Sequence, residues 1–410
     1  MVSRTKQQVI DEKIALLKEN IEEAFHTELL RDILDERPLK IYWGTATTGR
    51  PHCGYFVPAV KIAQFLSAGC EVTILLADLH AFLDNLKAPI ELVNHRVEYY
   101  RFVITAMLKA CGVPVDQLRF VKGSDFQKSE DYAFDLLKLS SLVSEKRSKK
   151  AGADVVKQTD NAPLSGLIYP LMQVLDEQYL DCDIQFGGLD QRKLFAASTE
   201  WLPKLGYRKR SHLMSPMVPG LNGNKMSSSD EGMYHNFKID LLDAPEIVAK
   251  KVNKAHCVAG EIEDNGLIAL VLYVLMPLSK MKTGTPRFTV EVDTAMLKHY
   301  TNIDDVRNDY KTHVLTPQML KVAVAKGLNE IMDPIRAEFA ASDEWQEITL
   351  KAYPPPAKKE KKVKNLGTRF PGAKSGESSK DTEKDTEKDT EKDTEKDTEK
   401  DTEKNVDEHS

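Results

Sequence analysis

Two short motifs of polar and small residues lie far apart in the chain, and both carry groups that can bind phosphate. One is Pro51-His52-Cys53-Gly54-Tyr55, and the other is Lys225-Met226-Ser227-Ser228-Ser229. Between them lies a third, Gly187-Gly188-Leu189-Asp190-Gln191. Each outer motif alone is weak, because the first can occur by chance and the second could be a solvated loop. In this order, they predict an ATP site assembled from two halves of one nucleotide-binding fold.

The chemistry that these groups suit is attack of a carboxylate on the α-phosphate of ATP. A carboxylate is ionised at neutral pH and needs no general base. Catalysis then depends on aligning the reactants and on stabilising the departing pyrophosphate. We expect His52 and Lys225 to supply that stabilisation, with Gly54 allowing the backbone to approach and Ser227 and Ser228 adding hydroxyl donors. The alternatives are that His52 only caps a helix and that Lys225 is simply exposed.

A phenol, an amide and a carboxylate form a second group, at Tyr169, Gln173 and Asp176. Their spacing i, i+4, i+7 brings the three to one side of a predicted helix, beside an apolar stripe. A solvated polar face is the ordinary explanation of such a group. The same three side chains could also bind an amino acid through its ammonium group and a polar side-chain tip.

These groups must be positioned by the elements around them. The run 40–44, KIYWG, is a short β-rich segment that ends in a Thr- and Gly-rich loop, 45–50. A helix is predicted over 55–68 and a buried strand over 71–79. Strand, helix, strand is a βαβ unit, which predicts a parallel sheet with ligands at the carboxyl ends of its strands. His52 then lies where a helix amino terminus would meet phosphate.

Hydrophobic spacing organises the rest of the chain around this unit. Helical periodicity over 9–36, stopped by Pro38, predicts an amino-terminal helix, and helical patterns that dominate 239–351 predict a separate domain. The other expected elements are strands over 184–187 and 213–217, a helix over 191–202 and a mostly helical stretch over 89–165. The predicted fold class is α/β. A helical segment at 1–36 precedes a Rossmann-like parallel-sheet catalytic domain at 37–232, which contains a helical insertion at about 89–165. An α-helical domain at 233–353 and a disordered charged tail at 354–410 follow it.

The carboxyl-terminal tail differs in composition from the rest of the chain. Five lysines between 358 and 364 follow three prolines, and six copies of Asp-Thr-Glu-Lys fill 381–404. Such a segment lacks apolar residues to bury and is expected to be disordered. Its lysines could form a nuclear-import signal or a weak RNA-binding patch, but we favour a solubilising or electrostatically attracting extension. Residues 375–410 hold 7 Lys against 15 Asp and Glu, so the net charge of −6 for the chain becomes +2 for the residues before them.

Cysteine usage and the amino terminus indicate a reducing compartment. The five cysteines are widely spaced and include no C-x-x-C pair, which is typical of free thiols. Residues 1–20 carry Asp11, Glu12 and Glu19 without an apolar run, unlike a secretory signal or a transit peptide. No stretch approaches the roughly 20 apolar residues that a membrane span needs. We therefore expect a cytoplasmic protein without a membrane partner, with a nuclear pool if the tail lysines act as a signal.

Taken together, four segments resemble one family of enzymes. They are 40–85 (KIYWGTATTGRPHCGYF through TILLADLHAFLDN), the helix at 165–180, GGLDQRK at 187–193 and KMSSS at 225–229. They are similar to class I aminoacyl-tRNA synthetases, specifically to the tyrosyl-tRNA synthetases of archaea and of the eukaryotic cytosol, over roughly residues 10–350. The resemblance implies ATP-dependent activation of L-tyrosine to tyrosyl-adenylate, transfer to tRNA(Tyr), a helical anticodon-binding domain and a homodimer. It also implies ATP with Mg²⁺ as the substrate complex, with no permanent cofactor and no metal site of the chain's own.

The resemblance assigns a tyrosine subsite with two ends. Tyr42 and Asp176 would hydrogen-bond the phenol of the substrate. The other residues of the subsite would hold the ammonium group and the backbone end of tyrosine, or line the pocket, and they are Tyr169, Gln173, Gln191, Gly44, Ala77 and His80.

The same resemblance assigns an ATP subsite. His52 and Gly54 would meet ATP, Asp190 its ribose, and Lys225 the pyrophosphate side. Gly188 and Met226 complete the residues expected to bind ATP, and the residues expected to be catalytic are His52, Lys225, Ser227 and Ser228. One departure is visible, because the class I signature usually ends in a second histidine where this chain has Tyr55. The role of Tyr55 is therefore open.

Three other functions share some of these features. A tryptophanyl synthetase has the same fold and both ATP motifs, but the pair Tyr42 and Asp176 and the spelling KMSSS favour tyrosine. A synthetase-derived RNA-binding protein without catalysis would not need His52, Asp190 and Lys225. A small adenylyltransferase with a similar His-x-Gly motif would not explain the helical region over 239–351.

Overall fold

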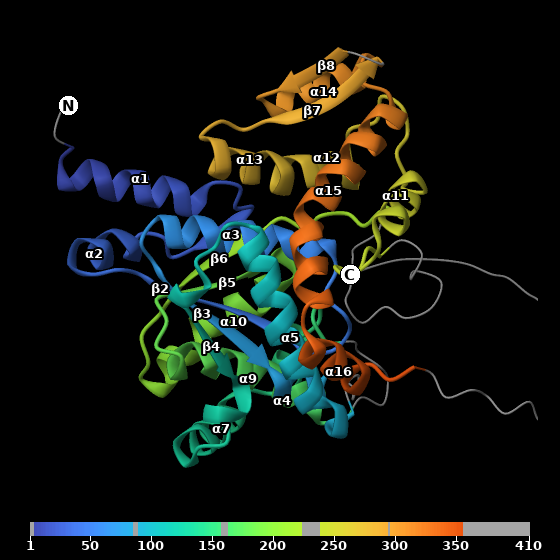
Figure 1. Ribbon diagram of the computed structural model, residues 1–410. Helices are drawn as coiled ribbons and strands as arrows, with labels where there is room; N and C mark the ends of the chain where they lie inside the picture. The colour runs from blue at the N-terminus through green and yellow to red at the C-terminus, as the bar shows by residue number, and fades with distance from the viewer. Residues whose placement is uncertain (1–3, 85–88, 157–162, 224–237, 294–295, 356–410) are drawn as a thin grey trace, which may run out of the picture. The chain divides into compact units, whose positions relative to one another are not determined.

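A six-stranded sheet runs through the computed structural model, which describes residues 4–84, 89–156, 163–223, 238–293 and 296–355 (Figure 1). These residues belong to one compact unit, Met1–Pro356. Neighbouring strands are parallel except β1, which pairs antiparallel with β6. The predicted α/β class with a parallel sheet is therefore confirmed. In spatial order the strands are β1 (Glu23–Phe25), β6 (Ser211–Ser215), β5 (Ile184–Gly188), β2 (Lys40–Ala46), β3 (Glu71–Ala77) and β4 (Leu118–Lys122).

The strand order changes direction at β2. The chain passes from β2 to β3 and β4 on one side, and later returns to β5 and β6 on the other side. In open parallel sheets, ligands bind in the crevice at the carboxyl ends of the strands where this change occurs. The carboxyl ends of β2 and β5 are therefore the place where the topology itself predicts a ligand site.

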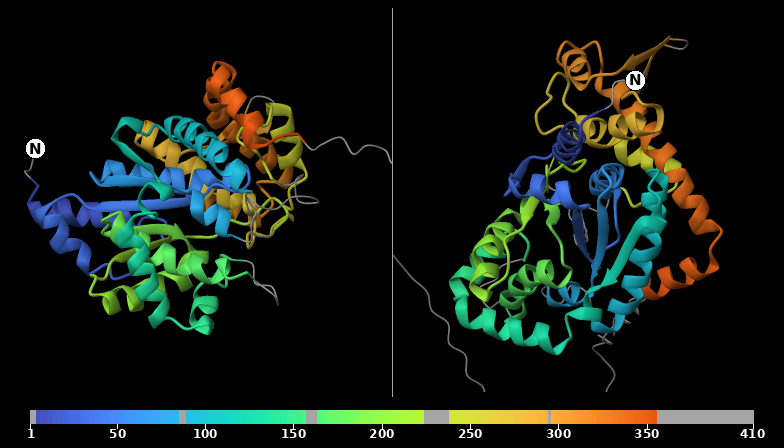
Figure 2. Two further views of the ribbon diagram at one scale, coloured as in Figure 1. Left: turned by 90° about the horizontal axis from the view of Figure 1, so that it is seen from below. Right: turned by 90° about the vertical axis from the view of Figure 1, so that its left-hand side faces the viewer.

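Helices cover both faces of the sheet (Figure 2). Trp43 of β2 lies in the core formed with α3 and α5, where Phe65 of α3 meets Phe186 of β5 edge-on at 5.1 Å. Tyr42 lies on the opposite face and packs with Cys182, just beyond the end of α9. Burial of both faces explains why β3 reads as an apolar run over Ile74–Ala77 rather than as an alternating strand. The bounds of the covering helices are α3 (Phe56–Ser67), α5 (Ile90–Ala110), α9 (Ser165–Tyr179) and α10 (Arg192–Trp201).

A buried aspartate ties the amino ends of three strands together. Asp183, just before β5, accepts hydrogen bonds from the guanidinium of Arg37 at 2.7 and 2.8 Å and from that of Arg208 at 2.9 Å. It also accepts one at 2.9 Å from the backbone N–H of Lys40, the first residue of β2. Because Arg37 precedes β2 and Arg208 precedes β6, this network fixes three strands whose opposite ends meet at the crevice.

The amino-terminal segment differs from the single helix expected over 9–36. It forms α1 (Lys6–Lys18), then β1, then α2 (Leu29–Glu36). Asn20 and His26 break the helix with φ of 57° and 54°, the left-handed conformation that does not continue a right-handed helix. The expectation was wrong because a strand of three residues is too short to show its own alternation within a helical pattern.

The stretch 89–165 is mostly helical, as expected, but it also supplies the edge strand of the sheet. β4 pairs parallel with β3, with Leu118 opposite Val72 and Lys122 opposite Leu76. The sheet therefore continues into the segment that the sequence predicted as a helical insertion. Besides α5, the helices of this stretch are α6 (Gly123–Phe126), α7 (Glu130–Leu142) and α8 (Glu145–Ala151), and α4 (Asp78–Leu83) precedes it.

The region beyond residue 238 is helical except for one hairpin. The hairpin, β7 (Phe288–Asp293) and β8 (Met296–Tyr300), is antiparallel and adds two unpredicted strands to 239–351, where helical patterns were expected to dominate. Helix α16 packs against α5, where the rings of Trp345 and Phe102 stack at 5.7 Å. The predicted boundary between residues 232 and 233 stays a prediction. The helices are α11 (Pro245–Asn253), α12 (Gly266–Leu270), a π-helical turn (Val271–Leu275), α13 (Met276–Thr283), α14 (Ile303–Lys311), α15 (Pro317–Ala340) and α16 (Asp343–Ala352).

The sequence analysis expected no stretch apolar enough to span a membrane, but one helical stretch meets that criterion. By length and composition, Gly266–Thr283 is apolar enough to cross a membrane, and half of it is buried inside the protein. Its buried side chains, such as Val271 and Leu278, belong to the main core. A buried core helix passes the same test of length and composition as a span.

Two predicted features lie outside the described residues. One is the KMSSS motif at 225–229, with Lys225, Met226, Ser227 and Ser228. The other is the charged tail, of which only residues 354 and 355 are described.

Candidate active site

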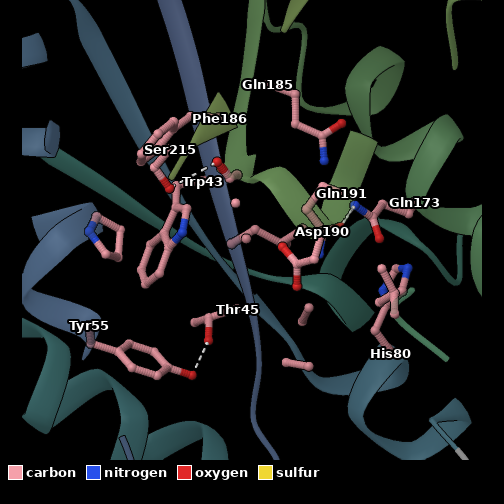
Figure 3. A pocket seen from close by; sticks show the side chains of 18 of the residues that line it. Trp43, Thr45, Tyr55, His80, Gln173, Gln185, Phe186, Asp190, Gln191 and Ser215 are labelled. Atoms are coloured by element: carbon pink, nitrogen blue, oxygen red, sulfur yellow. Dashed lines mark hydrogen bonds between the residues drawn. The ribbon is translucent and has the colours of Figure 1, made fainter. Parts of the chain in front are cut away.

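A pocket of about 510 Å³ opens at the carboxyl ends of the central strands (Figure 3). Its walls come from the ends of β2, β3, β5 and β6, from the turn after β2, and from α4 and α9. Every predicted site residue that the structure describes lines it, although these residues are spread over 150 positions of sequence. They are Tyr42, Gly44, His52, Gly54, Ala77, His80, Tyr169, Gln173, Asp176, Gly188, Asp190 and Gln191.

His52 stands at the start of a 3₁₀ turn, Cys53–Tyr55, that leads into α3. Its Nδ1 accepts a hydrogen bond of 3.2 Å from the backbone N–H of Gly54, so the neutral ring carries its proton on Nε2. Burial lowers the pKa of His52 to about 3, with a smaller contribution from the positive charge of Lys238. The capping role and a donor role toward a ligand are therefore compatible, because they use different ring nitrogens.

The turn that carries His52 is attached to the segment that follows the KMSSS motif. The backbone N–H of Cys53 donates to the carbonyl of Ile239 at 2.9 Å, and His52 and Asp240 form an antiparallel bridge. The first ATP motif and the residues just beyond the second are thus joined by the backbone, although they are almost 190 positions apart.

Tyr55 takes a packing role in the pocket wall. Its hydroxyl lies 3.2 Å from Oγ1 of Thr45, as the dashed line in Figure 3 shows. Its ring meets the rings of Trp43 and His52 edge-on, with centroids 6.1 and 5.3 Å apart. The side chain that replaces the second histidine of the motif therefore supports the ring of the first.

Two polar atoms at the deep end of the pocket are buried without a partner. The hydroxyl of Tyr42 and Oδ2 of Asp176 have no hydrogen bond among the residues that the structure describes. The Nε2 atom of His80, also unpaired there, lies 3.8 Å from Oδ2 of Asp176. A buried polar group normally has a partner, so these atoms indicate a place where a polar ligand binds.

Burial dominates the electrostatics of this deep end. It raises the pKa of Asp176 to about 7, while hydrogen bonds from Gln127 and Tyr132 act in the opposite direction. Burial also lowers the pKa of His80 to about 4, so its ring is neutral at pH 7. Because the pKa of Asp176 lies near neutral pH, the charge of its carboxyl at pH 7 is sensitive to the hydrogen bonds from Gln127 and Tyr132.

Tyr169, Gln173 and Asp176 lie on α9 as their spacing predicted. Tyr169 and Asp176 are buried, which excludes the interpretation of a solvated polar face. The amide of Gln173 donates from Nε2 to Oε1 of Gln191 at 2.9 Å (Figure 3), and the ring of Tyr169 meets that of His80 edge-on at 4.6 Å. The polar side of α9 therefore forms one wall of the pocket.

The double glycine at the end of β5 leaves room for the side chains that follow it. A Cβ atom on Gly188 would lie 2.6 Å from Oδ1 of Asp190, and one on Gly187 would lie 2.9 Å from Cγ of Gln191. Both distances are shorter than real contacts of this kind. A side chain at either position would therefore displace Asp190 or Gln191, which fold back over the end of the strand.

Several pocket residues were missed by the sequence analysis. Gln185 is buried in β5 and lines the pocket, and Ser215, at the end of β6, donates a hydrogen bond of 3.3 Å to the carbonyl of Gly187. A polar residue within the apolar run of β5 was a usable signal for Gln185. Gln127 and Tyr132, which contact Asp176, gave no such signal, because they lie almost 50 residues earlier in a stretch read only as helical.

Comparisons with known proteins agree on one family. The family model described as tRNA synthetases class I (W and Y) matches residues 34–333. The cytoplasmic tyrosine–tRNA ligase of Saccharomyces cerevisiae is 51% identical over 374 residues, which cover 88% of this chain and 94% of that protein. The cytoplasmic tyrosine–tRNA ligase of Danio rerio is 52% identical, and this chain spans 65% of its length.

Solved structures give the same answer. The tyrosyl-tRNA synthetase of Archaeoglobus fulgidus, complexed with L-tyrosine, has a TM-score of 0.72 at 34% identity and covers 80% of this chain and 99% of its own. The tryptophanyl-tRNA synthetase of Aeropyrum pernix K1 shares the fold, with a TM-score of 0.59 at 16% identity over 80% of this chain and 85% of its own. The chain therefore belongs to the class I tRNA synthetase family of the tryptophan and tyrosine enzymes, among the cytoplasmic tyrosyl-tRNA synthetases.

Proposed function

We propose that the chain is a tyrosine–tRNA ligase of the cytoplasm. It activates L-tyrosine with ATP to tyrosyl-adenylate, releases pyrophosphate, and transfers the tyrosyl group to tRNA(Tyr). The observation that carries the choice of tyrosine is that the hydroxyl of Tyr42 and Oδ2 of Asp176 are both buried and unpaired among the described residues, in the lining of one pocket. A phenol offers one donor and one acceptor, which match one free acceptor and one free donor at the end of the pocket.

Binding of tyrosine would use the whole length of the pocket. The phenol would donate to Oδ2 of Asp176 and accept from the hydroxyl of Tyr42. The ammonium group and backbone end would lie toward Tyr169, Gln173 and Gln191, which line the pocket with them. Phenylalanine would leave both polar atoms buried and unpaired, at a cost of about 1–3 kcal/mol for each. Tryptophan, the substrate of the related family members, has no hydroxyl to satisfy the same pair.

Activation joins the two substrates without a general base. The carboxylate oxygen of tyrosine forms a bond to the α-phosphorus of ATP, and the bond from that phosphorus to the bridging oxygen breaks. The electron pair leaves with pyrophosphate, which carries the charge that must be stabilised. The Nε2–H of His52 would donate to a phosphate oxygen, and this role is supported by the bond that already occupies Nδ1, which accepts from the N–H of Gly54.

The other groups of the ATP subsite act on its two ends. The adenosine half would be held by the backbone at Gly54 and Gly188, which can approach it closely, and by the carboxylate of Asp190. The KMSSS motif, with Lys225, Met226, Ser227 and Ser228, would bind the pyrophosphate side. Mg²⁺ arrives with ATP as part of the substrate. Among the described ranges, no group of three His, Cys, Asp or Glu side chains is arranged to hold a metal ion.

Recognition of tRNA and the state of assembly are further parts of this proposal. The helical region 233–353 would read the anticodon, and the lysines at 358–364 remain open to a role in RNA binding or nuclear import. The chain would act as a homodimer through the outer face of α7, where Phe134 and Leu137 are 59% and 66% exposed. The opposite face of α7 is buried with Tyr132 and Leu139, and a helix that is apolar on both sides needs a second cover.

Amino-acid-dependent ATP–pyrophosphate exchange tests the activity. Tyrosine, tryptophan and phenylalanine would be compared on one preparation of the full chain. We expect exchange with tyrosine and none above background with the other two. Exchange with tryptophan would overturn the specificity, and no exchange with any of them would support a non-catalytic RNA-binding protein instead.

A further inference from the structure

The carboxylate that faces the substrate phenol is held from behind by two side chains outside the substrate pocket. Nε2 of Gln127 donates to Oδ1 of Asp176 at 2.8 Å, and the hydroxyl of Tyr132 donates to the same oxygen at 2.9 Å. All three side chains are buried. Oδ1 is thus occupied twice, whereas Oδ2 has no partner among the described residues. Neither Gln127 nor Tyr132 lines the pocket, so neither would touch tyrosine.

The two donors are themselves fixed by the fold around them. Gln127 follows α6, whose start is anchored by a hydrogen bond of 2.8 Å from the N–H of Ser124 to Oδ1 of Asp78. Tyr132 lies in the first turn of α7, where Ser129 caps the helix by accepting from the N–H of Tyr132. Both donors therefore come from elements that follow the edge strand β4, while the carboxylate comes from α9.

The Tyr132 hydroxyl has two acceptors and only one proton. It lies 2.9 Å from the carbonyl of Met172 as well as 2.9 Å from Oδ1 of Asp176. When Asp176 is ionised, the hydroxyl donates to the carboxylate. When Asp176 is protonated on Oδ1, the carboxyl donates to the hydroxyl, which then turns its proton to the carbonyl. The direction of the Tyr132 hydroxyl is therefore tied to the charge of Asp176.

We propose that Gln127 and Tyr132 are positioning residues for tyrosine selection, which keep the Asp176 carboxylate ionised and direct its Oδ2 at the substrate phenol. The inference rests on the proposed function, because it assumes that tyrosine occupies the pocket. Hydrogen bonds to a charged group contribute more than those to a neutral one. Two donors on Oδ1 thus offset part of the cost of burying the charge and leave one defined acceptor for the ligand.

The other groups facing Asp176 do not supply this stabilisation. His80 of α4 is held neutral, because burial lowers its pKa to about 4. Glu177 of α9 and Asp78 of α4 are acidic and oppose the charge of Asp176. Tyr42 of β2 is buried, and its phenol stays protonated because burial and the nearby carboxylates raise its pKa well above the ordinary value. Gln127 and Tyr132 are the side-chain donors to Asp176 among the described residues.

The test compares Tyr132→Phe with a matched control, Tyr179→Phe. Tyr179 also donates from its hydroxyl to a carboxylate between α7 and α9, at 2.9 Å, but that carboxylate is Asp135. Its ring lies 4.8 Å from that of Tyr132, so the control removes the same atom from the same helix pair. Tyrosine-dependent ATP–pyrophosphate exchange is measured from pH 5.5 to 9, with KM for tyrosine and ATP determined separately. Gln127→Met provides a second variant if Tyr132→Phe does not fold.

For Tyr132→Phe we expect KM for tyrosine near pH 7.5 to rise roughly tenfold or more, the factor that corresponds to losing a hydrogen bond to a charged group. KM for ATP should stay at the wild-type value. The acidic limb of kcat/KM for tyrosine should move to higher pH, because loss of a donor raises the pKa of Asp176, and activity should recover in part at pH 9. Tyr179→Phe should behave as the wild type does.

Two failures are distinguishable. If the unmodified chain exchanges with tyrosine, but KM and the acidic limb of both Gln127→Met and Tyr132→Phe remain those of the wild type, the positioning role is overturned and the proposed function stands. If the unmodified chain shows no tyrosine-dependent exchange, the proposed function fails and the inference fails with it.

Discussion

Asp176 is an ionisable group that the fold buries in a place where the described residues do not satisfy both of its oxygens. One of its oxygens is bonded twice, and the other has no described partner. The hydroxyl of Tyr42 is likewise buried without a hydrogen-bond partner among the described residues. Such unpaired groups cost stability, and that cost is recovered when a ligand with the right donor and acceptor enters. The unpaired groups of Tyr42 and Asp176 would thus both select tyrosine and lower the stability of the protein without ligand.

This relation predicts that Asp176→Asn stabilises the protein at alkaline pH. The native carboxyl has a pKa of about 7, against about 3.9 in an unfolded chain. Between these values the native state binds a proton that the unfolded state has lost, so the free energy of unfolding falls as pH rises through this window. Asparagine carries no charge and avoids this loss, and Tm should rise by roughly 2–4 °C for each kcal/mol recovered.

Thermal unfolding at pH 5 and pH 8 checks the prediction. We expect the Tm of Asp176→Asn to exceed that of the wild type by more at pH 8 than at pH 5. An equal difference at both pH values would show that the charge of Asp176 does not affect stability.

At the scale of elements, α1 is attached to the sheet layer by a buried lysine. Nζ of Lys61, in α3, donates to the carbonyls of Leu16 and Glu19 at 2.9 and 2.7 Å and to Oε1 of Gln64 at 3.0 Å. Three acceptors match the three N–H groups of an ammonium. Two of them are carbonyls at the end of α1, where the last carbonyls of a helix lack their usual partners, although that of Leu16 also accepts from the N–H of Glu19 at 3.3 Å.

We expect Lys61→Met to release α1 without disturbing the pocket. The substitution removes the hydrogen bonds that join the end of α1 to α3, so backbone amide hydrogen exchange over residues 6–18 should become roughly tenfold faster or more. KM for tyrosine should not change. Lys109→Met is the control, because Lys109 forms an exposed ion pair with Glu338 at 2.8 Å, and exposed pairs contribute little. Equal exchange rates over 6–18 in both variants would contradict the role of Lys61.

Long or strongly patterned elements could be predicted from the sequence, and short or paired ones could not. The unit from β2 through α3 to β3 carries its own signals, and so does α9 with its polar side. β1 has three residues and β4 has five, and both are strands only because a neighbour in the sheet pairs with them. Such tertiary pairing leaves no local trace, which is also why β7 and β8 were taken as helix.

The candidate site divides in the same way. Residues near the carboxyl ends of the strands, such as Gly44, Ala77 and Gly188, were named because the family resemblance covers the motifs that contain them. Gln127 and Tyr132 were missed because they act on another side chain from a distant stretch. Sequence motifs show which residues meet the substrate, whereas contacts among buried side chains become visible only with the fold.

At the scale of the whole molecule, the helical region beyond residue 238 shares a core with the sheet domain. Trp345 of α16 stacks on Phe102 of α5, and Nε of Arg96 in α5 donates to the carbonyl of Ala352 at 3.3 Å. The hydroxyl of Tyr353 donates to the carbonyl of Thr48, in the loop before His52, at 3.3 Å. The end of the described chain is therefore held against the loop that precedes the ATP motif.

The proposed dimer is also a property of the whole molecule. We expect Leu137→Asp on the outer face of α7 to weaken self-association on the order of a hundredfold or more, because a two-fold interface contains the residue twice and each buried leucine contributes about 1.5–3 kcal/mol. Leu350→Asp is the matched control, with an exposed fraction of 65% against 66% for Leu137. Sedimentation velocity gives the mass of each variant. A Leu137→Asp variant with the same mass as the control at low concentration would place the interface elsewhere.

The central claim is that Tyr42 and Asp176 select the phenol of tyrosine. The most direct measurement is the ratio of kcat/KM for tyrosine to kcat/KM for phenylalanine in ATP–pyrophosphate exchange, compared between the wild type and Tyr42→Phe and Asp176→Ala. We predict that each substitution lowers this ratio by roughly tenfold or more, with KM for ATP unchanged, because the hydroxyl of tyrosine loses a partner that phenylalanine never had. A ratio that stays at the wild-type value in both variants would contradict the assignment of the pocket.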